Sequence, residues 1–148
     1  PYLTNSSAAD PQGATFQDFD SDGDLDYVAT NTSLARIGVA KNDGSGAFGT
    51  AVEYNAGGSA MVDPLKIGSG DFDSDGDFDS VITSNGNDYV YLFTNGGTAI
   101  FLYSNRTAVG DGPYGIAVGD VNNDGKLDYV TPNANTGNPS TVSVVTGN

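Results

Sequence analysis

The sequence predicts an all-β fold of three tandem β-propeller blades, each about fifty residues long and built from four antiparallel strands. An aspartate-rich window recurs three times along the chain, beginning at Asp18, Asp71 and Asp120. Short β-branched and aromatic runs follow each window, and no segment has a useful helical periodicity. A proline stands seven residues before each window, at Pro11, Pro64 and Pro113. Because separate landmarks keep the same phase, the chain is read as a repeat protein.

The predicted repeats cover approximately residues 11–63, 64–112 and 113–148 of a single repeat domain. One strand precedes each acidic window, a second follows it directly, and asparagine- and glycine-rich turns separate the later strands. The first strands are expected at 14–17, 65–70 and 114–119, and the second strands begin at Leu25, Phe78 and Leu127. The third strands are expected at 36–41, 89–94 and 141–146, and the fourth at 51–54 and 99–103.

The last blade lacks a fourth strand unless residues 1–5 or a neighbouring chain supply one. Propellers usually have about four to eight blades, so we expect a partial propeller or a unit that completes itself by assembly. An asparagine follows the start of the first two windows by 24 residues, at Asn42 and Asn95. Asn148 is the expected counterpart, which implies a four-residue insertion near residues 135–140.

Composition excludes several classes of function. The chain has no cysteine and no histidine, which rules out disulfides, thiolate metal sites and histidine-based catalysis or zinc binding. The formal charge of −14, from 19 acidic and 5 basic residues, argues against binding to nucleic acid or an anionic membrane. No apolar run approaches the ~20 residues of a membrane span. No signal peptide is recognisable, so we expect that any export leader has been removed.

The spacing of the windows predicts three metal sites. Oxygens at alternate positions of a tightly turned loop converge on one point, and a glycine at position six permits the turn. The turn glycines are Gly23, Gly76 and Gly125. Side-chain ligands are predicted at Asp18, Asp20, Asp22 and Asp26; at Asp71, Asp73, Asp75 and Asp79; and at Asp120, Asn122, Asp124 and Asp128. Backbone carbonyl ligands are predicted at Asp24, Asp77 and Lys126.

Calcium is the expected ion, with magnesium or manganese as competitors, because every ligand is a hard oxygen. Carboxylates within ~5 Å of one another repel by about 3 kcal/mol per pair at an effective dielectric near 20, so the loops need a cation. A single acidic turn could simply be solvated, but three in-phase copies favour metal binding. The third site is expected to be weakest, because Asn122 replaces a carboxylate and Lys126 adds a positive charge.

The loops differ from EF-hands and dockerins, which place an acidic ligand at position twelve and follow the loop with a helix. Position twelve is Ala29, Ile82 or Thr131, inside a predicted strand. The three loops and the strands after them resemble the calcium-binding FG-GAP or VCBS repeats of the integrin α-subunit propeller and of bacterial surface proteins. The resemblance covers nearly the whole chain, and it implies a β-propeller with calcium in the loop between the first two strands of each blade.

These observations predict a calcium-stabilised extracellular or cell-surface module for adhesion or structure, without enzymatic activity. Its partner would be a protein, a glycan or other copies of the chain, in an oligomer or filament. A lectin-like module is the alternative, and its candidate platforms are Tyr2, Tyr54, Tyr89, Tyr91 and Tyr103. A fragment of a polysaccharide-degrading enzyme is less favoured, because the acidic residues outside the windows form no recognisable constellation. Glycosylation sequons occur at Asn5, Asn31 and Asn105.

Overall fold

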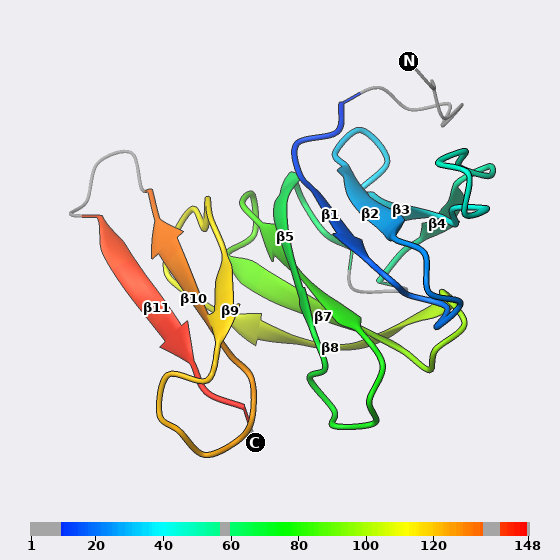
Figure 1. Ribbon diagram of the computed structural model, residues 1–148. Helices are drawn as coiled ribbons and strands as arrows, with labels where there is room; N and C mark the ends of the chain where they lie inside the picture. Colours follow the sequence, from blue (N-terminus) through cyan, green and yellow to red (C-terminus); the bar gives the residue numbers. More distant parts are fainter. Residues whose placement is uncertain (1–9, 57–59, 135–139, 148) are drawn as a thin grey trace.

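The computed structural model describes residues 10–56, 60–134 and 140–147. These residues form eleven strands in three antiparallel sheets, and no helix, so none that could span a membrane, occurs among them. The sheets stand side by side like successive blades, and in the described residues they do not close into a ring (Figure 1). The predicted all-β architecture of a partial propeller is therefore confirmed.

The sheets follow the chain in order, and we call them blades 1, 2 and 3. Blade 1 contains β1 (Ala14–Gln17), β2 (Asp26–Asn31), β3 (Arg36–Ala40) and β4 (Val52–Tyr54). Blade 2 contains β5 (Pro64–Gly70), β6 (Asp79–Ser84), β7 (Tyr89–Asn95) and β8 (Phe101–Ala108). Blade 3 contains β9 (Ala117–Gly119), β10 (Asp128–Asn133) and β11 (Thr141–Val145). Strands that are neighbours in the sequence pair within each blade, as in a meander.

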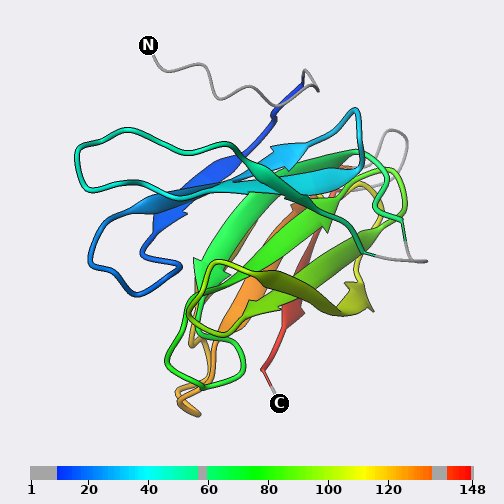
Figure 2. The same ribbon diagram turned by 90° about the vertical axis from the view of Figure 1, so that its right-hand side faces the viewer.

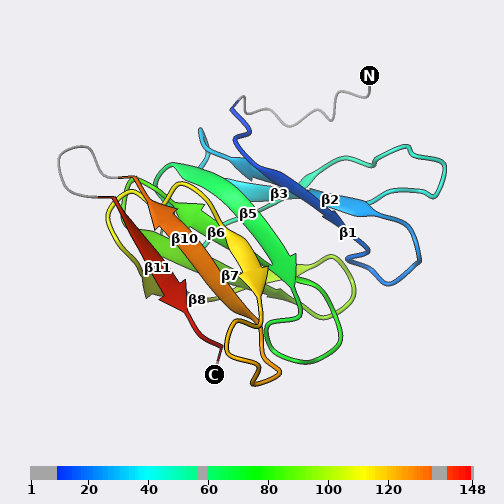
Figure 3. The same ribbon diagram turned by 60° about the vertical axis from the view of Figure 1, so that its left-hand side comes forward.

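The first strands of the blades, β1, β5 and β9, lie next to one another and run in the same direction (Figure 3). The acidic loops that follow these strands therefore all project from the same end of the molecule, where Figures 1 and 3 show them along one rim. Figure 2, turned by 90°, shows blade 1 as a separate layer packed across blade 2. This arrangement places three equivalent metal-binding candidates on one rim.

The hydrophobic core consists of two layers, one at each junction between blades. Ile82 on β6 faces blade 1 and packs with Val28 and Ile37, whereas its neighbour Val81 faces blade 3 and packs with Tyr129. Successive residues of a strand point to opposite faces, so both faces of blade 2 can be covered at once. All six residues of β6 are buried, because blades 1 and 3 cover both faces of this strand.

Some boundaries differ from those predicted. The strand β8 extends to Ala108 because a β-bulge between Leu92 and Phe93 lets it pair with all of β7, and β9 begins only at Ala117. The outer edge of β11 pairs with no strand in the described part of the chain. Residues 1–5 and the predicted insertion near 135–140 fall almost entirely outside the described residues.

Candidate metal sites

All three acidic loops share one hydrogen-bonded frame, centred on their first aspartate. The Oδ1 of Asp18 accepts a hydrogen bond from the Asp22 N–H at 3.1 Å, and its Oδ2 accepts one from the Gly23 N–H at 2.9 Å. Asp71 and Asp120 make the same pair of bonds within their own loops. These two bonds curl the backbone around the first aspartate, and in the first loop the carboxylates at positions one, three and five converge.

Two left-handed residues shape each loop, and sequence reasoning found only one of them. The glycines at position six have φ of +96°, +96° and +86°, and the three residues at position four have φ of 60° to 64°. The glycines are required for their backbone angle alone, because a Cβ added at any of them would meet no atom within 4 Å. The position-four residues are Ser21, Ser74 and Asn123, which are small and polar. Their recurrence in phase was a signal available in the sequence.

The last aspartate of each loop ties the loop to its own blade. Asp26, Asp79 and Asp128 are completely buried. In each, Oδ2 accepts the N–H of loop position two at 2.8 to 3.1 Å. The other oxygen accepts a backbone N–H at 2.8 to 2.9 Å from the turn after the third strand, and the donors are Asn42, Asn95 and Gly147. These carboxylates clamp the hairpin between the first two strands while keeping lone pairs for a cation.

These bonds correct one sequence assignment. The N–H donor lies 16 residues after the last loop aspartate in blades 1 and 2 and 19 residues after it in blade 3. The counterpart of Asn42 and Asn95 is therefore Gly147 in place of Asn148, which lies outside the described residues. The physical reason is that the equivalent position is defined by a backbone N–H, which any non-proline residue supplies.

In two of the loops the structure brings together three of the four predicted side-chain ligands, without Asp26 in the first loop and without Asp75 in the second. Oxygens of Asp18, Asp20 and Asp22 all lie within 4.8 Å of one another, and the same holds for Asp71, Asp73 and Asp79. In the first cluster, Oδ1 of Asp20 is buried without a hydrogen-bond partner. A buried carboxylate oxygen among other carboxylates is costly unless a cation binds it. The donor set and this orphaned oxygen therefore fit a calcium ion.

The third loop is different. Among the described residues it forms no cluster of three carboxylates, since Asn122 occupies position three. The Nδ2 of Asn122 donates to Oδ2 of Asp124 at 2.9 Å, and the Asp124 Oδ1 accepts the Lys126 N–H at 2.9 Å. The hydrogen bond from Lys126, then that from Asn122, lowers the pKa of Asp124. These hydrogen bonds therefore partly stabilise the negative charge of Asp124 without a cation.

The residues predicted to bind through their carbonyls occupy position seven. Asp75 at position five accepts the Asp77 N–H at 2.9 Å, as Asp22 does for Asp24. The Asp24 side chain lies over Gly44, and the Asp77 side chain lies over Gly97, so closely that a Cβ at either glycine would collide with a carboxylate oxygen. These side chains point to the following turn, which leaves their carbonyls as the ligand groups to be considered.

Burial shifts the acidity of the clusters. Desolvation raises the pKa of Asp79 to about 6, against the two hydrogen bonds that lower it, and the neighbouring Asp73 and Asp75 raise it further. Desolvation likewise raises the pKa of Asp26 and of Asp73. Each shift means that the folded chain resists carrying these negative charges without a compensating cation.

This raised pKa predicts an inverted pH dependence without metal. The folded chain then binds more protons than the unfolded chain between the ordinary aspartate pKa and about 6, so stability increases as the pH falls. From pH 7 to pH 4.5 in chelator, we expect a gain of about 2 kcal/mol from Asp79. Denaturant titrations in chelator measure it, and Asp79→Asn should abolish most of the gain. A loss of stability on acidification in chelator would contradict the prediction.

Sequence reasoning missed Lys41, which contacts the first cluster. Its Nζ lies 3.0 Å from Oδ2 of Asp20, and its side chain is about half exposed. The equivalent residue of blade 2 is Thr94, since each precedes the asparagine bound by the last loop aspartate. That position, next to the recurring asparagine, was the available signal. A cation at the first site must compete with this ammonium group.

Substitutions at Lys41 and Thr94 should therefore change the calcium affinities of the first and second loops in opposite directions. An ion pair whose ammonium group is half exposed contributes on the order of 1 kcal/mol, so Lys41→Thr should tighten calcium binding at the first loop about two- to five-fold. Thr94→Lys should weaken the second loop to a similar extent. Calcium titrations of each variant, in a background where Asp→Asn changes disable the other loop, provide the measurement. Unchanged affinities in both variants would show that the ammonium group does not compete.

A buried hydrogen-bond chain connects the first loop to the second. The carbonyl of Phe19 accepts bonds from Asn95 Nδ2 at 2.8 Å and from the Ala99 N–H at 2.9 Å. The Asn95 N–H in turn binds Asp79, while the Phe19 N–H binds Asp26. The Phe19 ring packs edge-on against Phe101, with centroids 5.3 Å apart. The first loop is thus anchored both to its own blade and to the next one.

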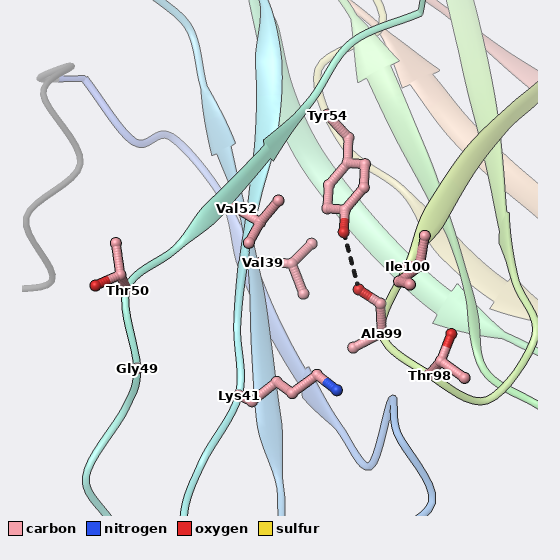
Figure 4. A pocket seen from close by; sticks show the side chains of 9 residues that line it. All are labelled: Val39, Lys41, Gly49, Thr50, Val52, Tyr54, Thr98, Ala99 and Ile100. Atoms are coloured by element: carbon pink, nitrogen blue, oxygen red, sulfur yellow. Dashed lines mark hydrogen bonds between the residues drawn. The ribbon is translucent and has the colours of Figure 1, made fainter.

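A pocket of about 410 Å³ lies between blade 1 and the β7–β8 turn of blade 2 (Figure 4). Its lining includes Val39, Lys41 and Tyr54, and the Tyr54 hydroxyl donates a hydrogen bond to the Ala99 carbonyl at 3.2 Å. Tyr91 is completely buried, while Tyr89 and Tyr103 pack against the core. Among the predicted tyrosine platforms, Tyr54 is therefore the one that reaches this pocket, and Tyr2 lies outside the described residues.

Comparison with known proteins agrees with the repeat pattern. A model of the FG-GAP-like repeat matches residues 18–82 and again residues 71–131, each match beginning at the first aspartate of a loop. A search of curated proteins gives no match. The two matches together span most of the chain and confirm the resemblance drawn from the acidic loops and their following strands. The chain belongs to the FG-GAP-like repeat family.

Proposed function

We propose that this chain is a calcium-stabilised extracellular module for adhesion or structure, with no catalytic role. The observation that carries the proposal is the pair of carboxylate clusters, one of which holds a buried oxygen without a partner. Each cluster belongs to a loop that is clamped at both ends by a buried aspartate. A bound cation would therefore stabilise the junction between the first two strands of the blade.

The chemistry of the clusters supports a structural ion. Their ligands are oxygens on a turned backbone, which suit calcium better than softer metals. One calcium ion would be held by Asp18, Asp20 and Asp22, and a second by Asp71, Asp73 and Asp79. When bound, calcium supplies positive charge that offsets carboxylate repulsion, and its binding free energy adds to folding stability. Sites of this kind are suited to the millimolar calcium outside cells, in keeping with the surface proteins in which such repeats occur.

Calorimetric titration of the chelator-treated chain with calcium chloride tests the proposal. We expect saturable binding at two stronger sites and a weaker third, because Asn122 and its hydrogen bonds reduce the charge of the third loop. Asp20→Asn together with Asp73→Asn should remove the stronger binding, whereas Asp10→Asn, an exposed residue outside the loops, should leave it unchanged. No measurable binding at millimolar calcium would refute the proposal.

A lectin-like function is the second candidate, and the pocket beside Tyr54 favours it. This pocket combines an apolar floor with Thr50, Thr98 and the Lys41 ammonium group. A glycan array with and without calcium distinguishes sugar binding from adhesion to protein. Among the acidic residues outside the windows, Asp43 gives no support to an enzymatic function. Its Oδ1 accepts hydrogen bonds from the Ser45 N–H at 2.9 Å and the Ser45 hydroxyl at 2.6 Å, as expected for a turn.

A further inference from the structure

We propose that copies of this chain join head to tail, with the outward face of blade 3 packing on the outward face of blade 1. The proposal names the partner that the proposed function leaves open, and it rests on that function only in expecting calcium to be present. We call the two surfaces the blade 3 end face, formed by Ala117, Gly119, Val130, Val142 and Val144, and the blade 1 end face, formed by Phe16, Leu25, Tyr27 and Phe48.

The repeat itself shows what should cover the blade 3 end face. In blade 2, Val90 pairs with Thr83 and Leu92 pairs with Val81, and this face is buried against blade 3. In blade 3, Val142 and Val144 hold the same register positions opposite Pro132 and Val130. Val90 is 1% exposed, whereas Val142 is 63% exposed and Val144 is 56% exposed. Within the residues that the structure describes, the same aliphatic surface is thus covered at blade 2 and exposed at blade 3.

The blade 1 end face carries the complementary half of a junction. Tyr27 and Tyr129 both follow the last aspartate of their loops, and Tyr129 packs against blade 2. Phe16 pairs with Tyr27 as Val118 pairs with Tyr129. The Phe16, Tyr27 and Phe48 rings form one group, in which the Phe16 centroid lies 6.4 Å and the Tyr27 centroid 5.1 Å from that of Phe48. Phe16 is 56% exposed, so this aromatic surface has no cover in the described part of the chain.

Two close contacts at the junction of blades 2 and 3 predict how these faces fit. The Leu127 side chain occupies the space beside Gly70 where a Cβ would stand, and Val118 does the same at Gly68. On the end faces, the equivalents of the two large residues are Leu25 and Phe16, both more than half exposed. The equivalents of the two glycines are Gly119, where a Cβ would meet nothing within 4 Å, and the exposed Ala117. Large residues on one end face therefore match small residues on the other.

The geometry of this contact is heterologous, because two different surfaces meet. Heterologous contacts close into a ring when the rotation permits and otherwise form open filaments. Two copies joined at both contacts would supply three blades each, a total within the range of about four to eight found in propellers. We therefore expect a dimer. The third loop of one copy would then adjoin the first loop of the other, as Ser21 and Asp77 adjoin at 3.3 Å within one copy.

Complementary single-face variants test this pairing. Phe16→Glu disables the blade 1 end face and Val144→Glu the blade 3 end face, while Leu102→Glu changes an equally exposed apolar residue on β8 of the middle blade. Molar masses are measured by light scattering in calcium, and melting curves verify that each variant is folded. We expect dimers for the wild type and Leu102→Glu and monomers for each end-face variant alone. An equimolar mixture of the two end-face variants should restore a dimer, weaker than the wild type because one contact remains.

A monomeric wild type at hundreds of micromolar would overturn the proposal. So would an end-face variant that still dimerises alone, because a symmetric contact through the other face would then be responsible. Calcium binding is measured separately by calorimetry on the same samples. A chain that binds calcium but stays monomeric refutes the head-to-tail contact alone, and a chain that dimerises without binding calcium refutes the proposed function alone.

Discussion

Removal of divalent cations should lower the melting temperature of this chain by roughly 10 to 20 °C. A ligand at one hundred times its dissociation constant stabilises the folded state by about 2.7 kcal/mol per site, and the two carboxylate clusters supply two such sites. For a chain of this size, each kcal/mol corresponds to about 2 to 4 °C. Stability is lost because, without a cation, the carboxylates within each cluster repel one another. The buried Asp26 and Asp79 still hold the loops in place through their hydrogen bonds, so these carboxylates cannot move apart freely.

Differential scanning calorimetry in excess calcium and in excess chelator measures this change. Calcium added back beyond the chelator should restore the original transition, and magnesium should restore less of it because it demands a smaller, octahedral set of ligands. An Asp20→Asn, Asp73→Asn double variant serves as the matched control, and its transition should respond weakly to either reagent. Superimposable curves in calcium and chelator for the wild type would contradict the structural role of the ion.

Phe19→Ala should destabilise the chain by about 3 to 5 kcal/mol, the usual cost of removing a fully buried aromatic side chain. The loss is expected to be large because Phe19 fills the junction between blades 1 and 2, where it contacts Phe101. Its backbone also links Asp26 to the Asn95 turn, so a cavity at this point loosens both loops. Denaturant unfolding in saturating calcium provides the measurement.

The repeat offers matched controls for this substitution at the same loop position. Phe72 is half-buried and contacts Tyr129 with centroids 6.3 Å apart, and Val121 is 54% exposed. Phe72→Ala should therefore cost less than Phe19→Ala, and Val121→Ala should cost below about 1 kcal/mol. If the three substitutions had equal effects, the position would matter for the loop itself, independent of the junction between blades.

Local sequence determined the strands and the acidic loops of this protein. The run after each window, such as Asp79–Ser84, combines β-branched residues with a fixed distance from a turn glycine, and β1 begins and ends at the residues expected from sequence. These features depend on backbone angles and on neighbours a few residues away, and such interactions are encoded in short stretches of sequence. The convergence of Asp18, Asp20 and Asp22 was predictable for the same reason.

The tertiary structure alone decided which groups meet across long separations. Nothing in the local pattern pairs Lys41 with Asp20, or the Phe19 carbonyl with Asn95 Nδ2, 76 residues away. The path of the chain in blade 3 likewise decides that the N–H donor to Asp128 is Gly147, where the sequence pattern had pointed to Asn148. The spacing of residues along the sequence determines which strands and which acidic loop belong to one blade. The distances between blades follow from how their faces pack, and that packing sums contacts from several strands at once.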